Sequence, residues 1–283
     1  MTRVVQISDT HLSPGKTHFG PNWAPLAAWV AAQSPDLVIH TGDVTVDGAG
    51  VEEDMRHCAA LLATLPAPVL SVPGNHDVGE AGHPQQPVNA ERLARWRRHL
   101  GPDWWLRDVA EWRLIGLDSM LFGSGLVAEL EQETWLEEAM AGAASRRIAV
   151  FTHRPFMVEQ AEEPDTGYWS VKPDLRRRML AAFDRHDVAI VATGHLHRAH
   201  EAIHRGRRHI WSGAAAFLVG PDFQPPMPGE ATLGAVVYDF HGREVTVTRP
   251  AVPGLTDFWI DHVAQEVYPV ARDTYPPSLA VEA

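Results

Sequence analysis

The chain has 283 residues, 45% of them hydrophobic, which is enough to bury a substantial core in one large α/β domain or two small ones. Asp and Glu (36) outnumber Lys and Arg (24), and the resulting net charge of −12 argues against a nucleic-acid partner, since a nucleic-acid groove needs a basic stripe. The single cysteine, Cys58, excludes an intrachain disulfide, and no apolar run approaches the length of a membrane helix.

Strand and helix patterns alternate up to residue 193. Residues 1–7 lead directly into a strand pattern without the apolar core of a signal peptide, so we expect a cytoplasmic protein with no membrane partner. Strand-like apolar runs lie at 4–8, 36–40, 69–72, 112–117, 147–151 and 188–192. Helix patterns lie between them, at about 23–33, 51–65, 90–99, 129–140 and 174–183. This alternation predicts βαβ units with largely parallel strand pairing.

The pattern changes after residue 193. Further strands and a hairpin are expected at 199–204, 208–211, 233–240 and 244–248. Residues 251–283 are rich in Pro and Tyr and show no clear period. We therefore expect one domain over residues 1–250, followed by a C-terminal extension over residues 251–283.

Side chains suited to metal binding follow five of the expected strands. Because sites in open α/β sheets form outside the carboxyl ends of the strands, these side chains are expected to meet at one place. Imidazole, carboxylate and amide groups without a thiolate suit Mn, Fe, Zn or Co. The candidate ligands are Asp9, His11, Asp43, Asn75, His153, His195 and His197.

Seven candidate ligands predict two metal ions, because a single ion would use three or four of them. Asp43 lies in the middle of the set, and its carboxylate has two oxygens with which to bridge the ions. Two ions about 3.5–4 Å apart can stabilise both the attacking and the leaving oxygen in phosphoryl transfer. A water acidified by the ions would act as the nucleophile.

His76 and Asp77 follow the candidate ligand Asn75 directly. His76 cannot easily share an ion with its neighbour, so we predict that it faces the substrate and donates a proton to the leaving alkoxide or a hydrogen bond to a phosphate oxygen. Asp77 is expected to orient the imidazole, as carboxylates beside a His commonly do. Both residues are therefore predicted to be catalytic.

Taken together, the motifs resemble the ordered signature of the calcineurin-like metallophosphoesterases. They are Asp9-x-His11, Gly42-Asp43, Gly74-Asn75-His76-Asp77, His153 and Gly194-His195-x-His197. The resemblance spans roughly residues 3–250 and implies a four-layer αββα sandwich of two mixed sheets. It also implies that Asp9, His11, Asp43 and His197 hold one ion, and that Asp43, Asn75, His153 and His195 hold the other.

Within that superfamily, the chain looks most like the class III cyclic-nucleotide phosphodiesterase and glycerophosphodiesterase group. The resemblance implies hydrolysis of a small phosphate ester, with cyclic nucleotides or glycerophosphodiesters as substrates. One departure from the group is Arg154, which stands where many cyclic-nucleotide members have a second His after the one matching His153. Arg154 could pair with a substrate carboxylate or phosphate, or hold a loop.

Several alternatives stay open. A phosphomonoesterase acting on a nucleotide or sugar phosphate would use the same two-metal site. A metal-binding scaffold without turnover is disfavoured by the presence of His76 and Asp77, and a nuclease by the acidic composition. The loop aromatics at 168–169 and at 18–19 are equally suited to stacking on a substrate and to covering the sheet edge.

The C-terminal extension carries large apolar side chains that need cover, which favours a homodimer. They are Phe258, Trp259, Tyr268 and Tyr275.

Overall fold

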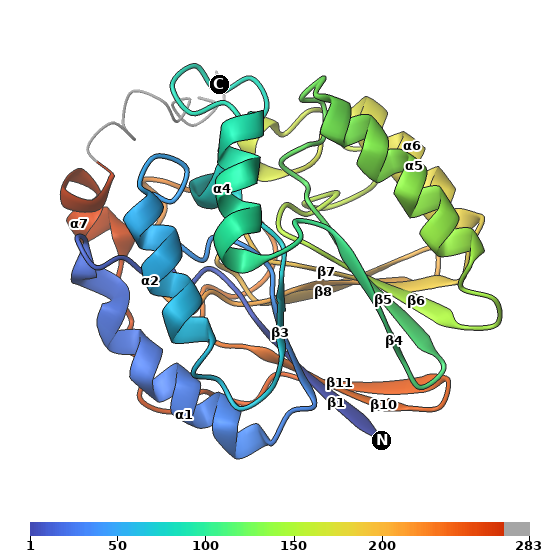
Figure 1. Cartoon of the computed structure of the whole chain (residues 1–283), viewed down its shortest axis with the longest axis horizontal. Helices are drawn as coiled ribbons and strands as arrows, with labels where there is room; N and C mark the ends of the chain where they lie inside the picture. Colours follow the sequence, from blue (N-terminus) through green and yellow to red (C-terminus); the bar gives the residue numbers. More distant parts are fainter. Residues whose placement is uncertain (269–283) are drawn as a thin grey trace.

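The computed structural model describes residues 1–268, which form two mixed β-sheets packed face to face between helices (Figure 1). The first sheet has the order β11-β10-β1-β2-β3, with β1 antiparallel to β10 and parallel to β2. Its strands are β1 (Thr2–Ile7), β2 (Leu37–His40), β3 (Val69–Ser71), β10 (Val236–His241) and β11 (Glu244–Thr248).

The second sheet has the order β4-β5-β6-β7-β9-β8. Its central strands β5, β6, β7 and β9 are parallel, and β4 and β8 pair antiparallel at the two edges. Its strands are β4 (Trp105–Val109), β5 (Trp112–Leu117), β6 (Arg147–Thr152), β7 (Val188–Thr193), β8 (His200–His204) and β9 (Arg207–Trp211).

Helices cover the outer face of each sheet, which confirms the predicted αββα layers (Figure 1). One group packs on the first sheet and consists of α1 (Trp23–Gln33), α2 (Glu52–Leu62) and α4 (Ala90–Leu100). The other group packs on the second sheet and consists of α5 (Val127–Ala141) and α6 (Pro173–Asp184). A third apolar cluster, which includes Val4 and Phe151, lies between the two sheets. Among residues 1–268, no helix combines the length and apolar character needed to cross a membrane.

The edge strand β4 is missing from the expected strands, which pass from residues 69–72 directly to residues 112–117. Its pattern is weak because three consecutive residues, 106–108, are exposed. Trp105 is nevertheless buried, and its indole nitrogen donates to the carbonyl of Ser71 at 2.9 Å. The indole thereby joins the edges of the two sheets.

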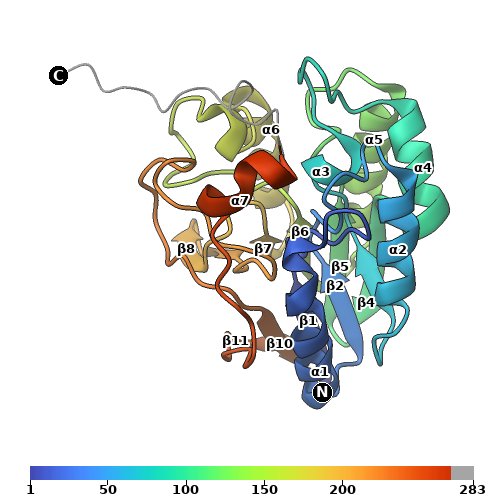
Figure 2. The same cartoon turned by 90° about the vertical axis from the view of Figure 1, so that its left-hand side faces the viewer.

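The C-terminal extension contains a helix, α7 (Ile260–Val267), where the sequence showed no clear period. Ile260, Ala264 and Val267 are buried against Phe19 and Phe217 in a small apolar cluster. Figure 2 shows α7 at the same end of the molecule as the short helix α3 (Asn75–Val78), and the ring of Tyr268, which follows α7, lies 4.6 Å from the ring of His76 on α3. Phe258 and Tyr268 pack on this cluster within the chain, whereas Tyr275 lies outside the described residues.

Candidate metal centre

The structure brings all seven predicted ligands together, and every one of them is buried. They come from the ends of four strands and the start of α3, as parallel strand ends in two packed sheets allow. Asp9 and His11 follow β1, Asp43 follows β2, Asn75 begins α3, His153 follows β6, and His195 and His197 follow β7.

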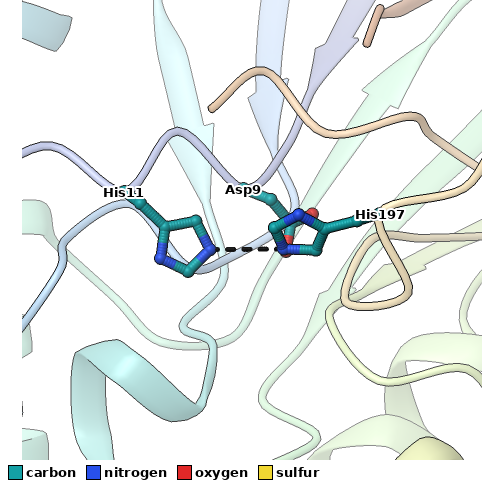
Figure 3. A group of neighbouring side chains, drawn as sticks. All are labelled: Asp9, His11 and His197. Carbon is teal, nitrogen blue, oxygen red and sulfur yellow. Dashed lines mark hydrogen bonds and ion pairs between the residues drawn. The ribbon is translucent and has the colours of Figure 1, made fainter. Parts of the chain in front are cut away.

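One group consists of Asp9, His11 and His197 (Figure 3). The Nε2 atoms of the two imidazoles are 3.3 Å apart, and Nε2 of His197 is 3.4 Å from Oδ1 of Asp9. Each side chain therefore directs a potential ligand atom at the same small space. A cation held there could bind both imidazole nitrogens together with the carboxylate of Asp9.

Asp43 links this group to a second one, formed by Asp43, His153 and His195. Oδ2 of Asp43 is 3.7 Å from Nε2 of His11 and 3.3 Å from Nε2 of His153. Nδ1 of His195 lies 3.1 Å from Nε2 of His153, which is also 3.3 Å from Oδ1 of Asn75. The donor atoms thus form two adjacent clusters with a carboxylate between them, and they fit two ions of the nitrogen- and oxygen-preferring class.

The backbone is strained at most of these ligands. Positive φ angles occur at Asp9 (52°), His11 (39°), Asp43 (52°), His195 (71°) and His197 (52°). Non-glycine residues rarely adopt this conformation, which costs about 1–3 kcal/mol per residue and concentrates at functional sites. The strained turns aim the side chains back toward one another across the strand ends.

Two glycines of the motifs make this close approach possible. A Cβ at Gly194 would lie 1.9 Å from Oγ of Ser8 and 2.5 Å from Oδ2 of Asp9. At Gly74 it would lie 2.2 Å from Oδ1 of Asp43. Only glycine lets these turns pack against the two carboxylates.

Each imidazole has one ring nitrogen that points into the clusters and one, here called the outer nitrogen, that points away from them. The outer nitrogens of three imidazoles contact backbone carbonyl groups. Nδ1 of His153 is 2.8 Å from the carbonyl of Thr41, Nδ1 of His197 is 2.8 Å from that of Phe217, and Nε2 of His195 is 2.9 Å from that of Tyr168. Such contacts fix the tautomer and orientation of a ligand imidazole. They involve backbone atoms, so the identity of the residues carries no signal for them in the sequence.

The electrostatics of the cluster favour a bound positive charge. Burial opposes protonation of His153. The charge of Asp43 and its hydrogen bond, together with the smaller effects of Asp9 and of the Thr41 carbonyl, outweigh burial and raise the pKa of His153 to about 9. Burial likewise opposes ionisation of Asp43, yet His153 and His76 lower its pKa well below the usual value. Burial lowers the pKa of His11 and of His195 well below 6.5. Since metal ions bind the deprotonated ligands, loading of this centre is expected to release a proton from His153.

His76 lies beside the cluster, half-buried, with its ring centroid 4.9 Å from that of His11. Its backbone N–H donates to Oδ1 of Asp43 at 2.9 Å, and its Nδ1 is 3.1 Å from the carbonyl of Val46. His76 could also complete a ligand group with His11 and Asp43. The structure therefore permits two roles for His76, toward the substrate or toward an ion.

Asp77 does not orient the imidazole of His76, so that interpretation of the sequence is wrong. Its Oδ1 accepts from the backbone N–H and the hydroxyl of Thr45, at 2.9 and 2.7 Å, and its Oδ2 accepts from the N–H groups of Gly74 and Val44, at 2.9 and 3.2 Å. The carboxylate thus joins the loop that carries Asp43 to the start of α3. Burial and the charge of Asp43 raise the pKa of Asp77 to about 6.

Asp77→Ala is expected to destabilise the metal-free protein by roughly 3 kcal/mol, because it leaves four buried donors without their acceptor. Urea unfolding of the chelator-treated protein measures this loss, and Asp77→Asn, which keeps one accepting oxygen, should lose less. A metal-free Asp77→Ala protein as stable as wild type would contradict this bracing role.

A cavity of about 50 Å³ adjoins the cluster. Tyr168 and Trp169 line it, together with Phe217, Ile260 and Tyr268. The loop aromatics at 18–19 do not line this cavity. Phe19 is fully buried against Phe217 and covers the core, and His18 pairs with Glu266 on α7.

Arg154 forms an ion pair with Glu80 and lies over the ring of Tyr168, with its guanidinium carbon 5.8 Å from the ring centroid. Its backbone N–H donates to the hydroxyl of Ser119 at 3.0 Å. These contacts support the second of the two roles considered for Arg154, which is to hold the loops around the site.

A comparison with known families agrees with the motifs. The family model for calcineurin-like phosphoesterases matches residues 2–199. The chain belongs to this family. It is accordingly a metal-dependent phosphoesterase.

Three curated relatives show how the family members vary. A probable glycerophosphodiester phosphodiesterase of Arcobacter nitrofigilis is 30% identical over 69% of this chain and 71% of its own length. The cyclic AMP phosphodiesterase of Escherichia coli K12 is 29% identical over 73% of each chain. A serine/threonine-protein phosphatase of Danio rerio is 28% identical over 65% of this chain and 60% of its own length.

Solved structures share the fold. A purple acid phosphatase from yellow lupin superposes with a TM-score of 0.64 at 14% identity, covering 91% of this chain and 52% of the lupin protein.

Proposed function

We propose that this calcineurin-like phosphoesterase binds two divalent ions. Asp9, His11, Asp43 and His197 would hold one, and Asp43, Asn75, His153 and His195 the other, with the metals drawn from Mn, Fe, Zn and Co. The observation that carries this proposal is the position of Oδ2 of Asp43, within 3.7 Å of His11 and 3.3 Å of His153, between the two clusters.

The ions would supply Lewis-acid stabilisation of the phosphate and acidify the attacking water. The chain itself would bind and orient the phosphate next to His76. From its position beside the cluster, the imidazole can donate a proton to the leaving oxygen, while the carbonyl of Val46 holds its Nδ1. The aromatic walls from Tyr168 and Trp169 would exclude water from the reacting group.

As the substrate class we propose small phosphodiesters, of the cyclic-nucleotide or glycerophosphodiester type. The names of two relatives support this class. A phosphomonoesterase is the second candidate, and the relative named as a protein phosphatase supports it.

Hydrolysis of matched p-nitrophenyl esters tests the two candidates. The chain is stripped of metal with a chelator and reconstituted with Mn²⁺, and bis(p-nitrophenyl) phosphate is compared with p-nitrophenyl phosphate. We expect faster turnover of the diester and none with chelated protein. A preference for the monoester would support the phosphatase, and two bound ions without turnover of either ester would contradict phosphoester hydrolysis at this site.

Three further expectations from the sequence stand as proposals. We propose that residues 1–250 form the phosphoesterase domain, that residues 251–283 extend it, and that the protein is cytoplasmic. We also propose a homodimer, although packing of Phe258 and Tyr268 within the chain removes part of its rationale. Cell fractionation tests the cytoplasmic location, and the elution volume of the full chain in gel filtration tests the homodimer.

A further inference from the structure

The outer nitrogen of His11 contacts a side chain, whereas those of the other three ligand imidazoles contact backbone carbonyls. The outer nitrogens of His153, His195 and His197 contact backbone carbonyls, whereas Nδ1 of His11 lies 2.8 Å from the hydroxyl of Tyr268. Tyr268 is 257 positions further along the chain and directly follows α7. The extension thus reaches the metal centre.

Several contacts hold Tyr268 in this place. Nζ of Lys16 donates to the carbonyl of Val267 at 2.5 Å, and His18 pairs with Glu266 at 3.1 Å. The apolar side of α7 is buried in its cluster with Phe217, whose carbonyl is the outer partner of His197. The same surface of the domain therefore positions α7 and one metal-ligand imidazole.

The tautomer of His11 follows from its two neighbours. Its Nε2 points at Asp43 and at Nε2 of His197, so Nε2 is the nitrogen that would bind an ion. Nδ1 must then carry the proton and donate it to the oxygen of Tyr268. The ring of Tyr268 also packs against His76, with centroids 4.6 Å apart, which restricts where the hydroxyl can lie.

We propose that Tyr268 is a positioning residue of the metal centre, whose hydroxyl fixes the tautomer and orientation of His11 and so raises the affinity for the ion held by Asp9, His11, Asp43 and His197. This inference rests on the metal assignment of the proposed function. It makes the C-terminal helix part of the centre, because docking of α7 delivers the hydroxyl. Loss of such an outer partner typically lowers metal affinity by about 10–100-fold.

Tyr268→Phe in the full chain tests the proposal, because it removes the hydroxyl and keeps the ring against His76. The metal-free proteins are titrated with Co²⁺ and followed by absorption and by bound-metal analysis. We expect wild type to bind two ions tightly. The variant should bind one ion as wild type does and the other about 10–100-fold more weakly. ¹⁵N NMR of metal-free protein should show the Nδ1-protonated tautomer of His11 in wild type and its loss in the variant.

Gln265→Ala is the matched control, since Gln265 is an exposed residue of the same helix and takes no part in the contacts described above that hold Tyr268. It should keep both Co²⁺ affinities. Equal affinities for both ions in wild type and Tyr268→Phe, with an unchanged His11 tautomer, would overturn the proposal. Faster ester hydrolysis by Tyr268→Phe at unchanged affinities would also overturn it and show that Tyr268 obstructs the cavity.

The outcome is separable from that of the proposed function. Wild type that binds two Co²⁺ ions but hydrolyses neither p-nitrophenyl ester contradicts the activity, while the affinity comparison still decides the role of Tyr268. Wild type that binds no Co²⁺ contradicts both.

Discussion

Asp43→Ala is expected to remove both metal ions and to reduce ester hydrolysis to the level of chelated protein. Among residues 1–268, Asp43 is the carboxylate placed between the two clusters, so its loss takes a ligand atom from each. It also takes the acceptor of the His76 N–H, which positions the start of α3. Bound metal per chain after reconstitution with Mn²⁺ measures the first effect, and diester hydrolysis measures the second.

Asp54→Ala provides a matched control for this loss. Asp54 is a similarly buried carboxylate on α2 that accepts from Ser13 and from the N–H of Asp47, outside the predicted ligand set. It should keep two ions. If Asp43→Ala instead kept one ion at wild-type affinity, Asp43 would belong to a single site and would not bridge.

The site was more predictable than the edges of the fold. Each predicted ligand follows an apolar strand, and strand ends in a parallel arrangement must meet, so spacing alone placed the seven side chains together. The layers followed from the resemblance carried by the same motifs. The edge strand β4 was missed because its exposed charged residues, Arg107 and Asp108, hide the alternation of a strand.

The contacts of Asp77 and Tyr268 leave no signal in the sequence. The role of Asp77 depends on four hydrogen-bond donors that converge only in the folded loop. Two of them are the backbone N–H groups of Val44 and Gly74, residues that have no polar side chain to indicate such a contact. Tyr268 reaches His11 because of a helix whose docking partners lie in distant loops, and no local pattern records that contact. Long-range contacts of single residues are set by the packing of the whole domain.

His76→Ala is expected to keep both ions and to lose about 10²–10⁴-fold in turnover of an alkyl phosphodiester, which is the usual contribution of a general acid. The imidazole lies beside the clusters, with its Nδ1 on the carbonyl of Val46, so its other nitrogen is the one available to a leaving oxygen. The rate of hydrolysis of a p-nitrophenyl ester should fall much less, because a phenolate of low basicity leaves without a proton. The ratio of the two rate losses is therefore the measured quantity.

His57→Ala is the matched control, since this imidazole lies on α2 outside the predicted site and should leave both rates unchanged. Equal losses on the alkyl and aryl esters would argue against proton donation and for a contact with the phosphate. Loss of one ion from His76→Ala would make His76 a ligand together with His11 and Asp43, the third group that the geometry allows. Bound metal must therefore be measured on the same preparation as the rates, because a proton donor and a ligand both slow turnover and only the ligand changes the metal content.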